Sequence, residues 1–189
     1  RRQDLDGVLV SNRALAARFD QLLATAQRRV VVASPYALDR RLVARMERSP
    51  APDRAMVLAP RNNFWCLRLI TPYLAHRLSR SGVRLTTFGC FSHAKFVLAD
   101  DVLLVGSSNF GRHSLTCNEE IGLVITDPAF VAAFETTVLA GATPLAASGG
   151  RWRRAVGRVS AALIDFHLMV YARVMVPLVP ALAADRRPC

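Results

Sequence analysis

Lysine is almost missing from this chain of 189 residues. Of its 25 basic Lys and Arg residues only Lys95 is a lysine, and with 14 acidic residues the formal net charge is +11. Hydrophobic residues make up 52% of the chain, which excludes a disordered protein and is enough for a buried core. The positive charge favours an anionic partner, such as nucleic acid, lipid headgroups or a phosphate-bearing substrate, without choosing among them.

Patterns for metal binding and for disulfides are also missing. The cysteines are scattered, with no CxxC pair and no histidine at metal-ligand spacing, which excludes a zinc site and a disulfide framework. Isolated buried thiols are the simpler interpretation. We therefore expect neither a metal nor a cofactor. The cysteines are Cys66, Cys90, Cys117 and Cys189.

Short apolar runs alternate with helical patterns in the first half of the chain. Strands are predicted at 29–33, 55–59 and 83–88, and helices at 11–27, 38–48 and 64–80. This alternation is typical of βαβ units. A hairpin then follows, with strands 94–99 and 102–105, and after it a strand at 120–126 and a helix at 128–139. The prediction is an α/β fold, a mixed β-sheet flanked by helices on both faces.

The chain divides by composition into three parts. Residues 1–140 form the predicted domain. The next segment, 141–150, is rich in glycine and small residues and is predicted to be a linker. The tail 151–189 begins with Arg-Trp-Arg-Arg and continues as an apolar segment that Asp165 and two prolines interrupt. A transmembrane helix fits this pattern poorly. The pattern favours a helical tail on an anionic membrane surface, and the alternative is a stripe packed on the domain or on a missing half.

The predicted hairpin carries the residues with the clearest chemistry. Side chains alternate along a strand, so His93 and Lys95 share one face, roughly 6–7 Å apart. The imidazole and the ammonium would repel each other if both were charged. A phosphodiester bound between them is an anion and would offset that repulsion. A neutral histidine is a competent nucleophile, and a lysine stabilises the negative charge that develops on phosphorus.

Three further polar residues follow the hairpin. Ser107 and Asn109 lie in the loop after its second strand and can donate to the other phosphate oxygens. Glu120 begins the next strand and can accept the second imidazole N–H, which would fix the tautomer of His93.

Read in order, these segments resemble the signature of the phospholipase D superfamily. That signature is His-x-Lys-(x)4-Asp, then Gly-Ser-x-Asn, then an Asn-x-Glu-type strand start, here at 93–100, 106–109 and 118–121. Residues 11–36 and 81–88 resemble other parts of the same domain, so the resemblance covers about residues 8–140. Within this superfamily the chain is most similar to bacterial cardiolipin synthases. This resemblance implies a location in the bacterial cytoplasm or at the periphery of the inner membrane.

The resemblance implies a mechanism. His93 becomes transiently phosphorylated or protonates the leaving group, Lys95, Ser107 and Asn109 hold the phosphate, and Glu120 orients the histidine. The reaction needs no metal, runs in two steps with retention at phosphorus, and passes the phosphoryl group to water or an alcohol.

The chain departs from the family pattern twice. The resemblance makes Asp100 a support for the motif loop, but five residues separate it from Gly106, one fewer than usual, which a shorter hairpin explains. The family site also needs two motifs, and this chain has one. The second would come from a homodimer partner or from a missing N-terminal half, which the start at Arg1 slightly favours.

Arg112 and His113, just after the loop, are weaker candidates for substrate contacts, and an ordinary surface role explains each of them better. The leading hypothesis is a phosphodiesterase or phosphatidyltransferase acting on phospholipid. The alternatives are a single-motif homodimeric endonuclease of the same superfamily and a catalytically silent binding module.

Overall fold

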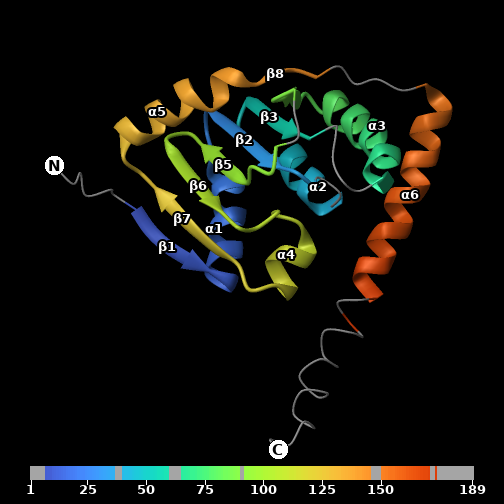
Figure 1. Ribbon diagram of the computed structural model, residues 1–189, viewed down its shortest axis with the longest axis horizontal. Coiled ribbons are helices and arrows are strands. Elements are labelled where there is room, and N and C mark those ends of the chain that lie inside the picture. The colour runs from blue at the N-terminus through green and yellow to red at the C-terminus, as the bar shows by residue number, and fades with distance from the viewer. Residues whose placement is uncertain are drawn as a thin grey trace, which may run out of the picture.

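The computed structural model describes residues 7–36, 40–59, 65–89, 92–145, 150–170 and 173. Its strands form one mixed sheet in the order β1-β7-β6-β5-β2-β3-β4-β8 (Figure 1). β2, β3 and β4 run parallel, and the other neighbouring pairs are antiparallel. The strands are β1 (Gly7–Ser11), β2 (Arg29–Ser34), β3 (Asp53–Leu58), β4 (Arg84–Thr87), β5 (Phe96–Ala99), β6 (Val102–Gly106), β7 (Ile121–Ile125) and β8 (Thr143–Pro144).

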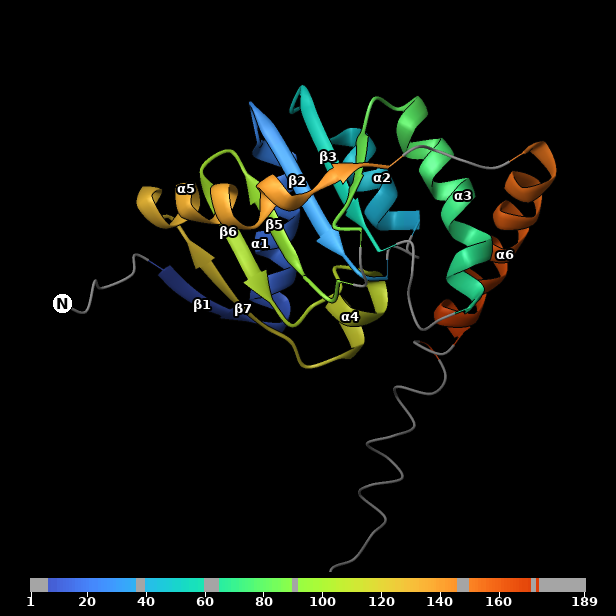
Figure 2. The same ribbon diagram turned by 45° about the horizontal axis from the view of Figure 1, so that its top comes forward.

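Helices cover both faces of the sheet, as predicted (Figures 1 and 2). On β2, Val30 and Val32 face the core shared with α1, α2 and α3, whereas Val31 and Ala33 face the core shared with α5. Such alternation is what a strand covered on both sides requires. The helices are α1 (Asn12–Thr25), α2 (Arg40–Arg48), α3 (Trp65–Arg80), α4 (Arg112–Cys117), α5 (Pro128–Thr137) and α6 (Arg151–Val170), with a 3₁₀ turn η1 (Leu139–Gly141) after α5.

The edge strand β1 was not predicted. It pairs antiparallel with β7, from Gly7 opposite Ile125 to Ser11 opposite Ile121. Val8 and Leu9 are 65% and 67% exposed, so no buried face marks this strand in the sequence. Its partner lies more than half the chain away, and this pairing, rather than local pattern, defines the strand.

The opposite edge of the sheet also differs from the prediction. Thr143–Pro144, inside the predicted linker, forms β8 and pairs with β4. The bond from Leu145 N to Leu85 O, 2.9 Å long, extends this pairing. A proline is tolerated here because β8 is the outermost strand. Part of the segment predicted as a linker therefore belongs to the sheet.

Helix α6 packs along α3 (Figure 1). Ala161 on its inner face is fully buried. At Gly157 an added Cβ would lie 2.5 Å from Leu69 O and 2.9 Å from Tyr73 Cβ, so only glycine allows the two backbones to approach this closely. Within the described residues, none of the helices has the length and the apolar character needed to cross a membrane.

Candidate active site

The candidate active site lies at the end of the sheet where β6 ends and β5 and β7 begin. Because β6 is antiparallel to both neighbours, the residues just before β5, just after β6 and just before β7 meet at this end. The bond from Gly106 N to Lys95 O, 3.3 Å long, joins the first two of these segments. The predicted residues that the topology brings to this end are His93, Lys95, Ser107, Asn109 and Glu120.

His93 and Lys95 are in direct contact. Lys95 Nζ lies 2.9 Å from Nδ1 and 3.1 Å from Nε2 of His93, and 3.0 Å from its carbonyl oxygen. The predicted strand 94–99 begins only at Phe96 in the structure, so residues 92–95 lie ahead of β5 and the strand geometry behind the estimate of 6–7 Å does not apply to them. The ammonium can donate only to an unprotonated ring nitrogen, and the neutral imidazole is the nucleophilic form.

Neighbouring residues contact His93 and change the pKa of Lys95. His93 is exposed, and the ring of Tyr36, two residues after β2, packs edge-on against it with centroids 5.7 Å apart. Burial lowers the pKa of Lys95 below the ordinary lysine value, and the negative charge of Glu120 opposes that shift. The lysine is therefore partly desolvated next to an accessible imidazole, a setting that strengthens its interaction with a bound anion.

The carboxylate of Glu120 is buried and held by hydroxyl groups. Ser107 Oγ donates to Oε2 and Ser114 Oγ to Oε1, while Asn118 Nδ2 donates to Oε1 at 3.3 Å. Asn12, the first residue of α1, fixes its backbone, since Glu120 N donates to Asn12 Oδ1 at 2.9 Å and Asn12 N to Glu120 O at 3.0 Å. In this structure the Ser107 hydroxyl is thus engaged with Glu120. The roles of Ser107 on phosphate and of Glu120 on His93 stay predictions.

Gly106, the glycine of the Gly-Ser-x-Asn segment, has a steric role. A Cβ at this position would lie 2.4 Å from the backbone oxygen of Ile121. Its absence lets β6 and β7 approach closely enough for Ser107 N to donate to Ile121 O at 2.9 Å. The glycine therefore fixes where the serine side chain begins.

The backbone of Asn109 is fixed by two serines. Ser114 Oγ accepts from Asn109 N at 3.0 Å, and Ser34 Oγ at the end of β2 donates to Asn109 O at 2.9 Å. The next residue, Phe110, is fully buried and stacks on Phe19 with ring centroids 4.9 Å apart. Within the described residues, Asn109 Oδ1 is buried without a hydrogen-bond partner. The carboxamide is thus held in place by its backbone while its own oxygen is unused.

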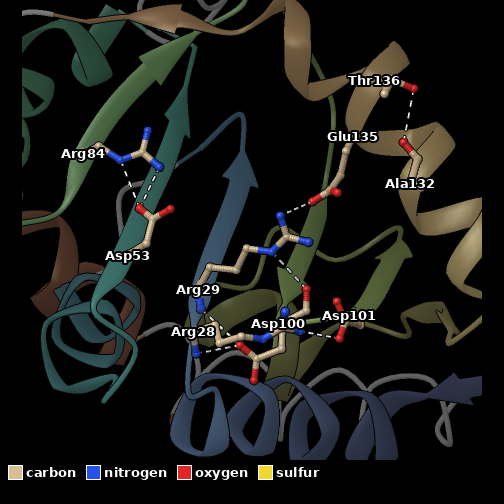
Figure 3. A network of polar contacts seen from close by, with 9 residues as sticks. All are labelled: Arg28, Arg29, Asp53, Arg84, Asp100, Asp101, Ala132, Glu135 and Thr136. Carbon is tan, nitrogen blue, oxygen red and sulfur yellow. Dashed lines mark hydrogen bonds and ion pairs between the residues drawn. The ribbon is translucent and has the colours of Figure 1, made fainter.

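Asp100 is not part of this group. It follows β5 at the end opposite His93, and its carboxylate accepts the backbone N–H groups of Arg28 at 2.8 Å and Arg29 at 3.1 Å (Figure 3). It also accepts the backbone N–H of Gln27 at 2.9 Å. Burial raises its pKa, but these bonds and the charge of Arg28 outweigh that effect, so the net pKa lies below the ordinary value. Asp100 therefore ties the hairpin to the start of β2, and it supports the motif from a distance.

The hairpin itself is short, as predicted from the missing residue. Ala99 pairs with Val102, so only Asp100 and Asp101 form the turn. Asp100 adopts φ 50°, in the left-handed region that aspartate tolerates better than most residues. The two-residue turn accounts for the reduced spacing between Asp100 and Gly106.

The weaker candidates and the residues that were missed lie on or near α4. His113 is half-buried on this helix, and the Arg112 side chain lies outside the described part of the structure. Ser114, 4% exposed, joins Glu120 to the backbone of Asn109 and was missed because a serine inside a helix carries no signal of its own. Within the described ranges, no three His, Cys, Asp or Glu residues gather as they would around a metal ion.

Comparison with known proteins identifies the family. The model of the family described as cardiolipin synthase, PLD-like domain, matches residues 19–139, more than half of the chain. The chain belongs to this family, within the phospholipase D superfamily. The superfamily's members are phosphodiesterases or phosphatidyltransferases. No curated protein sequence matches the chain.

Solved structures show the same fold at low sequence identity. Phosphatidylserine synthase from Haemophilus influenzae Rd KW20 is 16% identical, with a TM-score of 0.61 over 93% of this chain and 49% of its own. Nuc from Salmonella typhimurium is 18% identical, with a TM-score of 0.54 over 74% of this chain and 99% of its own. NucT from Helicobacter pylori is 13% identical, with a TM-score of 0.55 over 75% of this chain and 100% of its own.

Proposed function

We propose that the chain provides one half of the active site of a phosphodiesterase or phosphatidyltransferase that acts on phospholipid. The contact between Lys95 Nζ and the His93 ring carries the proposal, because it joins a nucleophile and a cation at the accessible end of the sheet. A phosphodiester bound here would meet both groups at once. This arrangement favours nucleophilic attack at phosphorus over simple anion binding.

In the proposed first step, a nitrogen of His93 bonds to phosphorus and the bond from phosphorus to the leaving oxygen breaks. Lys95 offsets the charge on the equatorial oxygens, and the Asn109 amide donates to another of them. A histidine from the second motif protonates the leaving alcohol. In the second step water or an alcohol attacks phosphorus, the N–P bond breaks, and the attacking group gives its proton to that same histidine.

The second motif has two proposed sources. A homodimer would place two copies of this site face to face, and a longer protein would supply the motif from the same chain. Light scattering on the purified chain separates them. A chain that has the molar mass of a dimer and is active supports the homodimer. A monomer that is inactive alone and gains activity when the upstream half is added supports the longer protein.

Phospholipid is the preferred substrate because of the C-terminal part of the fold. The similarity to phosphatidylserine synthase covers 93% of this chain, a share that must reach into α6, since only 150 of the 189 residues precede that helix. The family description, cardiolipin synthase, points to the same class. The acceptor in a transfer reaction would be an alcohol on a second lipid.

A homodimeric endonuclease is the second proposal. The observation in its favour is that this chain spans 99% of Nuc and 100% of NucT, so each is a chain about as long as the shared domain. The net charge of +11 suits DNA as well as anionic lipid. The two proposals differ in substrate and share the same His93 chemistry.

One experiment tests both proposals. The purified chain is given phosphatidylglycerol in mixed micelles, or supercoiled plasmid DNA, each with EDTA present. Release or transfer of the headgroup without nicking supports the lipid reaction, and nicking alone supports the endonuclease. His93→Ala removes the nucleophile and should abolish either activity, whereas His167→Ala, an exposed histidine on α6, should keep it. Full activity in the His93→Ala protein would overturn the mechanism.

A further inference from the structure

Helix α6 carries an apolar stripe on its outer face. Its side chains are 39% to 79% exposed, although all are large and hydrophobic. Their spacing of three, four or seven residues places them on one side of the helix, opposite Gly157 and Ala161, which are buried. An exposed apolar face of this kind marks an interaction surface. The stripe consists of Trp152, Val159, Leu163, Phe166 and Val170.

Arginines border this stripe near the start of the helix. At 100° per residue, Arg151 and Arg158 fall on one side of the stripe and Arg153 on the other. On the first side, a hollow of about 430 Å³ opens between α6 and α3, lined by Tyr73, His76, Arg151, Arg154, Ala155 and Arg158. No acidic side chain is among these lining residues, so the hollow is suited to an anion.

A second hollow lies on the other side of α6. It has a volume of about 490 Å³ and is lined by Leu69, Pro72, Trp152, Arg153 and Val156. This lining is apolar apart from one arginine. The outer face of α6 thus combines, from one side to the other, a basic hollow, an apolar stripe and a mainly apolar hollow.

We propose that the outer face of α6 docks on the surface of an anionic phospholipid bilayer. The stripe would enter the boundary between headgroups and acyl chains, and the basic hollow would hold a lipid phosphate. Apolar side chains flanked by arginines are the pattern of a helix lying in the membrane interface. The long arginine side chains can extend to the phosphates while the helix lies deeper.

Charge favours a lipid surface over a second copy of this chain. Two copies joined by a twofold axis that runs along this helix would bring the arginines of one helix near those of the other, which is unfavourable. An anionic bilayer presents the opposite charge to the arginines in the first two turns of the helix. Docking also has a geometric consequence, because α6 runs along α3 towards the end of the molecule at which α4 lies (Figures 1 and 2). The catalytic loops lie at that same end of the sheet.

Vesicle co-sedimentation tests the docking without any turnover, so its outcome is independent of the proposed reaction. The full chain is mixed with vesicles of equal parts phosphatidylglycerol and phosphatidylcholine, or of phosphatidylcholine alone. We expect binding to the anionic vesicles, weakened by salt. Arg151→Gln with Arg158→Gln should weaken binding about fivefold for each arginine lost. The matched pair Arg13→Gln with Arg18→Gln, on α1, removes the same charge and should have a much smaller effect.

A second set of variants tests the apolar stripe. Leu163→Gln with Phe166→Gln should abolish most vesicle binding, whereas Val8→Gln with Leu9→Gln, equally exposed on β1, should not. In a Trp65→Phe protein Trp152 is the remaining tryptophan, and its fluorescence should shift to shorter wavelength on anionic vesicles. All variants should retain hydrolysis of bis(p-nitrophenyl) phosphate if the wild type shows it, since none of them replaces a candidate catalytic residue.

Two results would overturn the proposal. The first is a wild-type chain that stays in the supernatant with both kinds of vesicle. The second is a wild-type dimer that the Leu163 and Phe166 substitutions convert to monomers, because a second copy would then cover the stripe.

Discussion

Lys95 Nζ touches both ring nitrogens of His93, at 2.9 and 3.1 Å, and the carbonyl oxygen of the same residue at 3.0 Å. A single compact cation therefore spans the ring and the backbone of the residue proposed as nucleophile. A planar guanidinium cannot make the same set of contacts from the same position. The only lysine in the chain thus occupies the position where its difference from arginine matters most.

Lys95→Arg should lower kcat at least ~10²-fold, the effect of removing one transition-state donor. The positive charge is kept, so the loss would come from geometry. Hydrolysis of bis(p-nitrophenyl) phosphate measures it, with thermal unfolding as the check that the protein is folded. Turnover close to that of the wild type would show that any cation suffices.

Glu120 should shift the alkaline limit of activity through Lys95. The pKa of Lys95 is lowered by burial, and the charge of Glu120 raises it again. Glu120→Gln removes that charge, so the lysine should lose its proton at lower pH and the alkaline limb of the kcat profile should move to lower pH. Glu119→Gln, exposed next to it, should leave the limb in place. A profile unchanged in both variants would rule out this coupling.

Ser114→Ala should destabilise the fold by about 1–3 kcal/mol, because it leaves buried polar groups of Glu120 and Asn109 with fewer partners. Urea unfolding measures the change. Ser79→Ala, at an exposed position of α3, should change the free energy of unfolding by less than about 0.5 kcal/mol. Equal stability of the two variants would contradict the network around Glu120.

Asp100 should make stability depend on pH in acid. Because its folded pKa lies below the unfolded value, its contribution is fully present above the unfolded pKa and is lost as pH falls through the folded one. Asp100→Asn should therefore be less stable than the wild type near neutral pH, by about 1–3 kcal/mol, and approach it in acid. Asp101→Asn removes an exposed ion pair with Arg28 and should cost at most ~1 kcal/mol. Urea titrations across the acid range separate the two.

Gly157→Ala should loosen α6 from α3. The added Cβ would meet the backbone oxygen of Leu69 at 2.5 Å, and overpacking of this kind typically costs about 1–3 kcal/mol. Gly150→Ala, where a Cβ meets nothing within 4 Å, is the control. Faster proteolysis within α6 in the first variant alone would support the packing, and equal rates would contradict it.

The sequence predicts most of the sheet because its inner strands are locally marked. β2, β3 and the β5–β6 hairpin are short apolar runs bounded by polar or proline residues, and this local signal is sufficient. β1 and β8 lack such a signal, because distant partners define them.

The sequence likewise predicts some features of the site and not others. His93, Lys95, Ser107, Asn109 and Glu120 come to one end of the sheet as expected, since antiparallel pairing leaves little freedom there, whereas Asp100 lies at the other end of the hairpin. Three details depend on tertiary contacts that spacing does not encode: the Lys95–His93 contact, the engagement of Ser107 by Glu120, and the bonds of Asp100 to the start of β2.

The placement of β8 and α6 has a practical consequence for where this protein can be truncated. The family match ends at residue 139, yet β8 completes the sheet edge beside β4, and Ala161 of α6 is part of the main core. A chain shortened to the family boundary would expose an unpaired strand and the apolar side of α3 together, a combination that promotes aggregation. The unit defined by sequence similarity is thus smaller than the unit that folds, and work with isolated fragments should keep the residues through α6.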